Sequence, residues 1–84
     1  MDDLENNIKT SEILLVLFDD ETSKYLSYNI PHKLIHISDN EIREFYDIDT
    51  VPTISVFKNK NLLANIIGFK SKTELLRSLN NILN

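Results

Sequence analysis

Residues 13–18 form the longest uninterrupted apolar run in this chain, with the sequence Ile-Leu-Leu-Val-Leu-Phe. Continuous apolarity of this length is typical of a strand whose side chains are buried on both faces of a sheet. A fold built around that strand therefore needs other elements on both sides of the sheet. The run is much shorter than the roughly 18 apolar residues that indicate a membrane span, so we expect no membrane segment.

Helices and strands are predicted to alternate along the chain. The hydrophobic pattern predicts strands at 13–18, 33–37, 53–57 and 62–67 and short helices at 3–9 and 21–28. Two more helices begin at capping boxes, in which a serine is followed three residues later by a glutamate: Ser38 with Glu41 and Ser71 with Glu74. The first of these two helices is expected to direct three side chains toward the core: Ile42, Phe45 and Tyr46.

The segment 46–60 contains Val51-Pro52-Thr53 directly before a predicted strand. Pro52 has no backbone N–H, so it must lie at the start or the edge of that strand. The segment resembles the part of thioredoxin-like proteins that enters the sheet through a cis-proline and leaves through a hairpin. The resemblance implies a cis bond before Pro52. It also implies a left-handed Lys60, at a cost of about 1 kcal/mol, because the family usually has Asn-Gly in the hairpin.

The order of the predicted elements, α-β-α-β-α-β-β-α, resembles the same family over nearly all of residues 3–84. We therefore predict one α/β domain, residues 1–84, with a minimal thioredoxin-like fold. Its mixed sheet has helices on both faces and four strands in the order 33–37, 13–18, 53–57, 62–67. The family's first strand is missing, and the crossover between Phe18 and Lys33 holds only fourteen residues.

The family's usual redox chemistry is not expected. The chain of 84 residues has no cysteine, and an ungapped match from Phe18 places Ser23-Lys24-Tyr25-Leu26 where the family has Cys-x-x-Cys. A serine hydroxyl cannot take part in thiol–disulfide exchange, and no histidine lies near Ser23 in sequence to activate it. Two histidines, His32 and His36, would lie about 13 Å apart in a strand, too far to share an ion. We predict no enzymatic activity, no cofactor and no metal.

A groove beside Pro52 is the first candidate surface for a protein partner. In thioredoxin-like proteins the residue before the proline presents its backbone to an extended peptide, and the matching residue here is Val51. The predicted groove residues are Ser23, Tyr25, Tyr28, Thr50, Val51, Pro52, Gly68 and Phe69. The alternatives are that Pro52 only begins a strand and that the aromatic residues belong to the core.

The strand 33–37 is the second candidate surface, because the missing first strand would leave it as a bare edge. An unpaired edge can accept a strand from a partner or from a second copy of the chain, giving a homodimer. The residues of this edge are Lys33, Ile35, His36 and Ile37. The alternative is that residues 29–32 or a loop cover it.

Charge is divided unevenly along the chain. Residues 1–50 carry twelve acidic and four basic side chains, a net charge of −8, whereas residues 51–84 have a net charge of +4. The basic side chains of the second half are Lys58, Lys60, Lys70, Lys72 and Arg77. They make docking to a ribonucleoprotein such as the ribosome an alternative function. The other interpretation is a solvated hairpin and helix surface.

Thioredoxin-like domains without working cysteines offer a model for function. The segment from Phe45 to Thr53 is similar to the N-terminal thioredoxin-like domain of multidomain monothiol glutaredoxins and to thioredoxin domains that dock on large assemblies such as the proteasome. The resemblance implies a redox-inactive adaptor or scaffold that binds a protein or a large complex. The acidic N-terminus lacks the features of a signal peptide, so we expect a cytoplasmic protein, with the nucleus as the alternative compartment.

Overall fold

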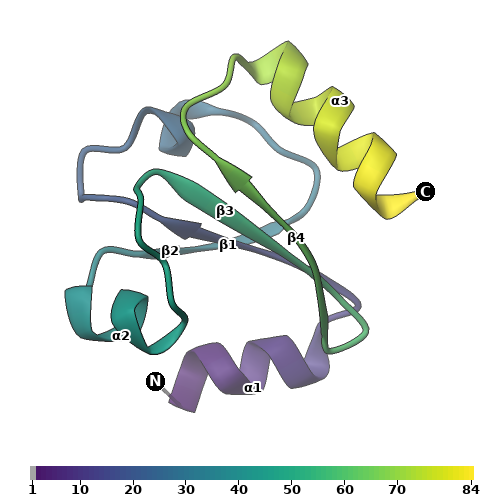
Figure 1. Cartoon of the computed structure of the whole chain (residues 1–84). Helices are drawn as coiled ribbons and strands as arrows, with labels where there is room; N and C mark the ends of the chain where they lie inside the picture. The colour runs from purple at the N-terminus through teal and green to yellow at the C-terminus, as the bar shows by residue number, and fades with distance from the viewer. Residues whose placement is uncertain (1) are drawn as a thin grey trace.

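A computed structural model describes residues 2–84 of the chain (Figure 1). Its elements in order are α1 (Asp2–Thr10), β1 (Ile13–Phe18), the 3₁₀ helix η1 (Lys24–Ser27), β2 (Lys33–Ile37), α2 (Asn40–Phe45), β3 (Thr53–Lys58), β4 (Asn61–Ile67) and α3 (Lys72–Leu83). None of the helices in this described part of the chain has an apolar stretch long enough to cross a bilayer.

The strands form one mixed sheet in the order β2-β1-β3-β4, which confirms the predicted order. β1 and β2 are parallel, whereas β3 is antiparallel to both β1 and β4. α3 and η1 cover one face of the sheet, and α1 and α2 cover the other (Figure 1). The result is a three-layer α/β fold with β1 near its centre.

Two core clusters lie on opposite faces of the sheet. Leu15 and Leu17 of β1 pack with Leu75 and Leu79 of α3 on one face. On the other face, the remaining buried residues of β1 pack with Leu4 of α1: they are Leu14, Val16 and Phe18. The alternation of β1 side chains between the two clusters explains why residues 13–18 are continuously apolar.

The second predicted helix is much shorter than expected. Instead of a helix over 21–28, the structure has only η1, a single 3₁₀ turn that begins after Ser23. Residues before it form a turn in which an oxygen of Asp20 accepts hydrogen bonds from the backbone N–H and the hydroxyl of Thr22. An aspartate side chain that bonds the backbone two residues ahead favours a turn over a helix, which accounts for the shortening.

The start and the buried side of α2 also differ from the sequence prediction. Asp39, and not Ser38, caps the helix: its Oδ1 accepts hydrogen bonds from the N–H groups of Glu41 at 2.8 Å and Ile42 at 3.2 Å. Ile42 and Tyr46 pack against the core as predicted. Phe45 is exposed, so the prediction that its side chain faces the core is wrong. With only six residues, α2 can direct a single narrow stripe of side chains toward the sheet.

Predictions for the hairpin and the last helix are confirmed. Asn59 and Lys60 both have positive φ, 50° and 75°, so Lys60 is left-handed. Ser71 caps α3 by accepting a hydrogen bond from the N–H of Glu74 at 3.2 Å. β3 and β4 are each one residue longer than predicted on the hairpin side, which reduces the turn to two residues.

Candidate functional site

The loop before β3 lies between two shallow depressions at the end of β1. One depression, of about 260 Å³, is lined by Asp19, Asp20, Ile37, Ser38, Asn40, Arg43 and Val51. The other, of about 310 Å³, is lined by Asp19, Asp20, Thr22, Ser23, Lys24, Pro52 and Phe69. Because Asp19 and Asp20 line both, the two depressions form one continuous surface around Val51 and Pro52. We call this surface the proline groove.

Val51 presents both its side chain and its backbone to solvent. The side chain is 41% exposed. The peptide bond between Val51 and Pro52 is cis. Among residues 2–84, neither the N–H nor the C=O of Val51 has a hydrogen-bond partner. These two groups are therefore free to bond the backbone of another polypeptide.

The segments around Val51 are fixed by hydrogen bonds. The carbonyl oxygen of Pro52 accepts a bond from the N–H of Gly68 at 2.9 Å, and the Thr53 hydroxyl donates to the carbonyl oxygen of Thr50 at 2.5 Å. Gly68 has a φ of +87°, a conformation that glycine adopts without steric cost. The predicted groove residues Thr50, Pro52 and Gly68 thus hold the loop rather than project from it.

Ser23 lies in the groove but is engaged in the local fold. Its Oγ accepts a hydrogen bond from the N–H of Tyr25 at 3.3 Å and so caps η1, and the side chain is buried. The structure brings Ser23 and Pro52 to the same depression, as the sequence match implied. No imidazole or carboxylate of the described residues bonds the Ser23 hydroxyl, so the geometry offers no base to activate it.

Three aromatic residues form a cluster at one end of the groove. Tyr25 and Phe69 have ring centroids 4.9 Å apart, and Tyr28 lies edge-on to Tyr25 at 5.3 Å. Tyr25 is only 1% exposed and belongs to the core, whereas Phe69 is 50% exposed. The ammonium of Lys24 lies 5.8 Å from the centre of the Phe69 ring. Phe69 is thus the aromatic side chain that a ligand can contact, and the tyrosines support it.

Burial also changes the chemistry of Tyr25. Desolvation raises the pKa of its hydroxyl above the ordinary value of 10.0, and the nearby Tyr28, Asp19 and Glu74 add to the rise. The hydrogen bond that the hydroxyl accepts from the Lys70 N–H opposes this effect. Tyr25 therefore remains neutral at physiological pH and acts as a structural donor and acceptor.

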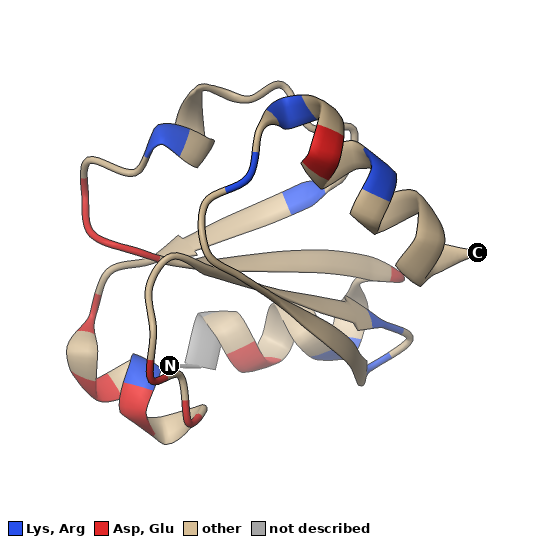
Figure 2. Ribbon diagram, turned by 45° about the horizontal axis from the view of Figure 1, so that its top comes forward, with Lys and Arg blue, Asp and Glu red and all other residues tan. Residues whose placement is uncertain are grey.

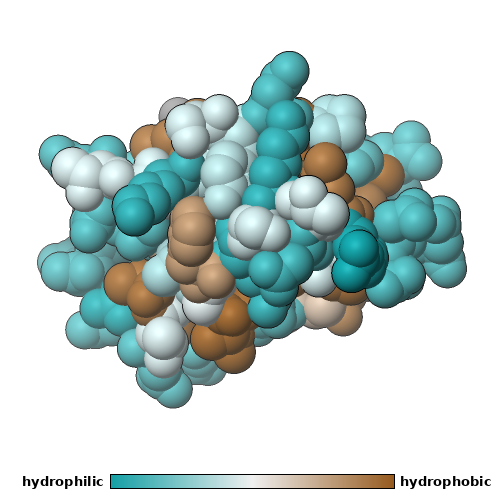
Figure 3. Space-filling view, turned by 90° about the horizontal axis from the view of Figure 1, so that it is seen from above, coloured by the Kyte–Doolittle hydropathy of each residue, from teal (hydrophilic) through white to brown (hydrophobic). Residues whose placement is uncertain are grey.

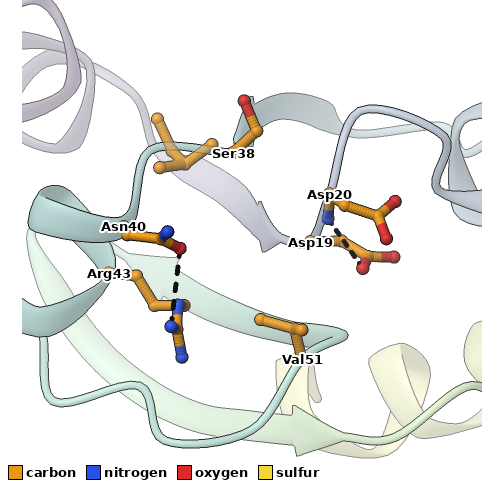
Figure 4. Close-up of a pocket in the computed structure, with 7 residues that line it drawn as sticks. Asp19, Asp20, Ser38, Asn40, Arg43 and Val51 are labelled. Atoms are coloured by element: carbon orange, nitrogen blue, oxygen red, sulfur yellow. Dashed lines mark hydrogen bonds between the residues drawn. The ribbon is translucent and has the colours of Figure 1, made fainter.

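Charged residues line the other end of the groove (Figure 4). Asp19 and Asp20 follow β1 on one side of the depression, Asn40 and Arg43 of α2 lie on the other, and Val51 lies between them. Arg43 is held in place by donating to the carbonyl oxygen of Ile48 at 3.0 Å and to Asn40 Oδ1 at 3.5 Å. No three carboxylate or imidazole groups of residues 2–84 converge as they would around a metal ion.

Comparison with solved structures identifies the fold around this groove. A thioredoxin mutant from Halobacterium salinarum matches with a TM-score of 0.78 at 12% identity, over all of this chain and 86% of the other. Thioredoxin from Plasmodium falciparum matches with a TM-score of 0.74 at 19% identity, over 96% of this chain and 92% of the other. The fold is thioredoxin-like. No protein-family model matches the sequence, and no curated protein does either.

A designed protein is similar to the same extent as the natural thioredoxins. The match has a TM-score of 0.78 at 21% identity and covers all of this chain and 87% of the designed protein. The thioredoxin-like fold here combines with a sequence that has no cysteine. The groove therefore lacks any thiolate of its own, which is the group that performs thiol–disulfide exchange.

The predicted edge strand β2 is open only through its backbone. Ile37 accepts a hydrogen bond from the Asp19 N–H at 3.2 Å, so its backbone groups point toward β1. Since strand residues alternate, Leu34 and His36 point their backbone groups outward. Within residues 2–84, no hydrogen bond from residues 29–32 covers this edge. The side chains of Ile35 and Ile37, in contrast, pack against the core.

Other bonds of β2 fix its polar side chains. His36 Nε2 lies 3.2 Å from the carbonyl oxygen of Asp19 and 2.9 Å from that of Asp20, and Lys33 Nζ donates to Asn7 Oδ1. The His36 ring thus links β2 to the first residues of the proline groove. A partner strand at this edge would contact Lys33 and the outward backbone rather than a surface of apolar side chains.

The basic residues of the second half do not form one patch. Lys58 and Lys60 lie at the β3–β4 hairpin, whereas Lys70, Lys72 and Arg77 lie beyond the other end of β4 and on α3 (Figure 2). The seven residues of β4 separate the hairpin lysines from Lys70 by about 20 Å, at roughly 3.4 Å per residue, whereas Arg77 lies on α3, which packs against the sheet. The sequence could not show this division, because it depends on the direction of β4.

Two parts of the surface were not predicted from the sequence. The first is the lining of the groove by Asp19, Asp20 and Arg43, although the acidic pair directly follows the central strand, a position where loop side chains often meet. The second is a group of exposed apolar side chains on β4: Leu62, Leu63 and Ile67. Their exposure could not be foreseen because α3, α1 and α2 leave the outer side of that strand uncovered (Figure 1).

Proposed function

We propose that this thioredoxin-like chain is a redox-inactive adaptor that binds an extended segment of a protein partner in the proline groove. The observation that carries the proposal is the state of Val51, which is half exposed and whose N–H and C=O lack partners among residues 2–84. An extended peptide can bond both groups, as a strand does when it adds to a sheet. Affinity would then come from the backbone and selectivity from the flanking depressions.

The side chains around Val51 define the kind of segment that fits. Phe69 offers a half-exposed aromatic face beside Pro52, suited to an apolar side chain of the ligand. Asp19 and Asp20 line both depressions, together with Phe69 in one and Arg43 in the other, and favour a basic side chain of the ligand. We therefore infer a ligand segment that pairs an apolar residue with a basic residue about two positions away, because alternate side chains of a strand point to the same side.

The absence of enzymatic activity is part of the proposal. Thiol–disulfide exchange needs a thiolate, and the chain has no cysteine. Ser23 occupies the corresponding place as a helix cap. An assay of disulfide reduction is expected to show no turnover above the buffer control, and turnover would exclude this part of the proposal.

Selection of a displayed library of random peptides on the chain tests the proposal. Peptides selected on the unmodified protein should bind Val51→Asp and Phe69→Ala at least about tenfold more weakly, a loss of roughly 1.4 kcal/mol. Phe45→Ala is the matched control, since Phe45 is an exposed phenylalanine outside the groove. Equal binding to all three variants, with each folded by circular dichroism, would contradict the proposal.

The ribonucleoprotein alternative is less well supported than peptide binding. Lys58 and Lys60 lie at the hairpin end of β4, whereas the other basic side chains of the second half lie after β4 or on α3, so the five are divided between two regions of the fold (Figure 2). A nucleic-acid interface is expected to combine several phosphate contacts on one face. Binding to RNA that weakens steeply with salt would favour the alternative.

A further inference from the structure

We propose that His36 is a positioning residue of the proline groove, a role that rests on the proposed peptide-binding function. His36 lies in β2, outside the two depressions, and its side chain reaches the loop that follows β1. There its Nε2 lies 2.9 Å from the carbonyl oxygen of Asp20 and 3.2 Å from that of Asp19. Both aspartates line both depressions. A side chain of β2 thereby holds the acidic residues of the groove in place.

The position of His36 in its strand explains why these bonds form. Strand side chains alternate, so His36 lies on the same face of the sheet as Leu34, which packs against the core cluster beneath α3. A half-buried imidazole on this face loses contact with water, and the loss costs free energy unless the polar atoms of the ring are bonded. The bonds to the carbonyl oxygens of Asp19 and Asp20 compensate for that cost.

The same contacts determine which ring nitrogen carries the proton. Carbonyl oxygens only accept hydrogen bonds, so Nε2 of His36 is the donor and shares its proton between the two oxygens. Nδ1 has no partner among residues 2–84, and in this part of the chain no buried side-chain nitrogen or oxygen lacks one. Nδ1 is therefore accessible to solvent. Since Nε2 keeps its proton in both the neutral and the charged ring, the link to the loop persists when Nδ1 gains a proton.

The carboxylates of the loop are oriented by its backbone. Asp19 Oδ1 accepts a hydrogen bond from the N–H of Asp20 at 2.8 Å (Figure 4), and Asp20 Oδ1 accepts one from the N–H of Thr22 at 3.0 Å. Each carboxylate keeps its second oxygen without a partner among the described residues. The peptide bond is planar, so a bond that fixes the Asp19 carbonyl also fixes the Asp20 N–H. His36 thus sets the direction in which the unpaired oxygens point.

This geometry bears on selectivity more than on overall affinity. Seen from the side of α3 and η1, the surface carries separate hydrophobic groups among hydrophilic ones, so a ligand meets both kinds of contact (Figure 3). A cationic side chain forms charge-assisted hydrogen bonds only with carboxylates that point toward it. If the loop were loose, ordering it would cost free energy on binding. That cost would fall on contacts to the aspartates and spare those to Phe69, which packs on Tyr25.

Two peptides test the positioning role: a library-selected peptide that carries a lysine, and the same peptide with norleucine in its place. His36→Leu should weaken the lysine peptide at least about tenfold and the norleucine peptide by less than about twofold. His36→Gln should recover most of the lost affinity, because the glutamine amide can donate to the same carbonyl oxygens. Equal loss for the two peptides, or no recovery in His36→Gln, would overturn the role.

His32→Leu is the matched control for these measurements. His32 is a half-buried histidine outside the groove, and it has no hydrogen-bond partner within residues 2–84. Its substitution should leave the affinities for both peptides unchanged. Circular dichroism establishes that each variant is folded. A loss of lysine selectivity in His32→Leu equal to that in His36→Leu would contradict a specific role for His36.

Nuclear magnetic resonance of the free protein separates this inference from the proposed function, because it needs no peptide. The ring ¹⁵N shifts of His36 should show the Nε2–H tautomer of the neutral ring. The order parameters of amides 19–22 should fall from about 0.85 to below about 0.6 in His36→Leu. An Nδ1–H tautomer, or an unchanged loop in that variant, would overturn the role of His36 even if peptides bind. The expected ring and loop behaviour without any peptide binding would support the link to the loop and contradict the proposed function.

Discussion

The hydroxyl of Tyr25 donates a hydrogen bond to the carbonyl oxygen of Gly68 at 3.0 Å, across 43 residues of sequence. The same hydroxyl accepts a bond from the N–H of Lys70 at 2.6 Å. Gly68 in turn donates to Pro52. Tyr25 therefore links the three segments that build the proline groove: η1, the loop before β3 and the turn after β4.

Tyr25→Phe should destabilise the fold by about 1–3 kcal/mol, because it removes two part-buried hydrogen bonds, one to the Gly68 carbonyl oxygen and one from the Lys70 N–H. The ring itself is retained, so core packing should change little. Denaturant unfolding measures the loss. Tyr28→Phe is the matched control: it removes only one part-buried bond, to the carbonyl oxygen of Lys70, and should cost about 0.5–1.5 kcal/mol. Equal effects of the two substitutions would contradict the role assigned to Tyr25.

Alkaline pH should destabilise the protein through two tyrosines, the buried Tyr25 and the partly buried Tyr46. Burial raises the pKa values of Tyr25 and Tyr46 above 10.0, so the unfolded chain releases these protons first. Their contribution to stability is complete below about pH 10 and is lost as pH rises above that value through the folded pKa. The free energy of unfolding, measured from pH 8 upward, should fall less steeply in Tyr25→Phe. An identical slope in that variant would contradict the raised pKa.

The succession of helices and strands along the chain could be predicted because it depends on patterns that each segment carries alone, whereas their order across the sheet was predicted from the resemblance to thioredoxin-like proteins. The apolar run of β1, the strand after Pro52 and the apolar stripe of α3 are all local signals. The length of η1 was not predictable in this way. Its start depends on the bonds that Asp20 and Ser23 accept from backbone N–H groups two residues ahead, which compete with a helix.

Asp39→Ala should destabilise α2 and the fold by about 0.5–2 kcal/mol, because Asp39 bonds two N–H groups at the start of the helix. Ser38→Ala is the control and should change the free energy of unfolding by less than about 0.5 kcal/mol, as expected for an exposed residue outside the cap. Thermal and denaturant unfolding of both variants provide the measurement. A larger loss of stability in Ser38→Ala than in Asp39→Ala would indicate that Ser38 caps the helix, as the sequence predicted.

Lys60→Gly should stabilise the hairpin by about 1 kcal/mol, because Lys60 has a φ of 75°, where a side chain is strained and glycine is not. Lys58→Gly is the control. Lys58 lies in β3, where glycine should instead cost about 0.5–1 kcal/mol. Both substitutions remove one positive charge, so their difference in denaturant unfolding reports on the backbone. Destabilisation by Lys60→Gly would contradict the turn geometry.

The candidate site could be predicted only in part. Val51, Pro52, Ser23 and Phe69 do meet in one groove, as the resemblance implied. Sequence could not separate the exposed Phe69 from the buried Tyr25, because both are aromatic residues next to the same loop and their burial depends on the packing of α3.

The most direct test of the account is a titration of ¹⁵N-labelled protein with a peptide selected from the displayed library. The largest amide shift changes should fall on Val51 and on its neighbours in the groove, Lys24 and Phe69. The amides of β2 and β4 should change little. Largest changes along either edge strand, or no change with any selected peptide, would contradict the proline groove as the binding surface.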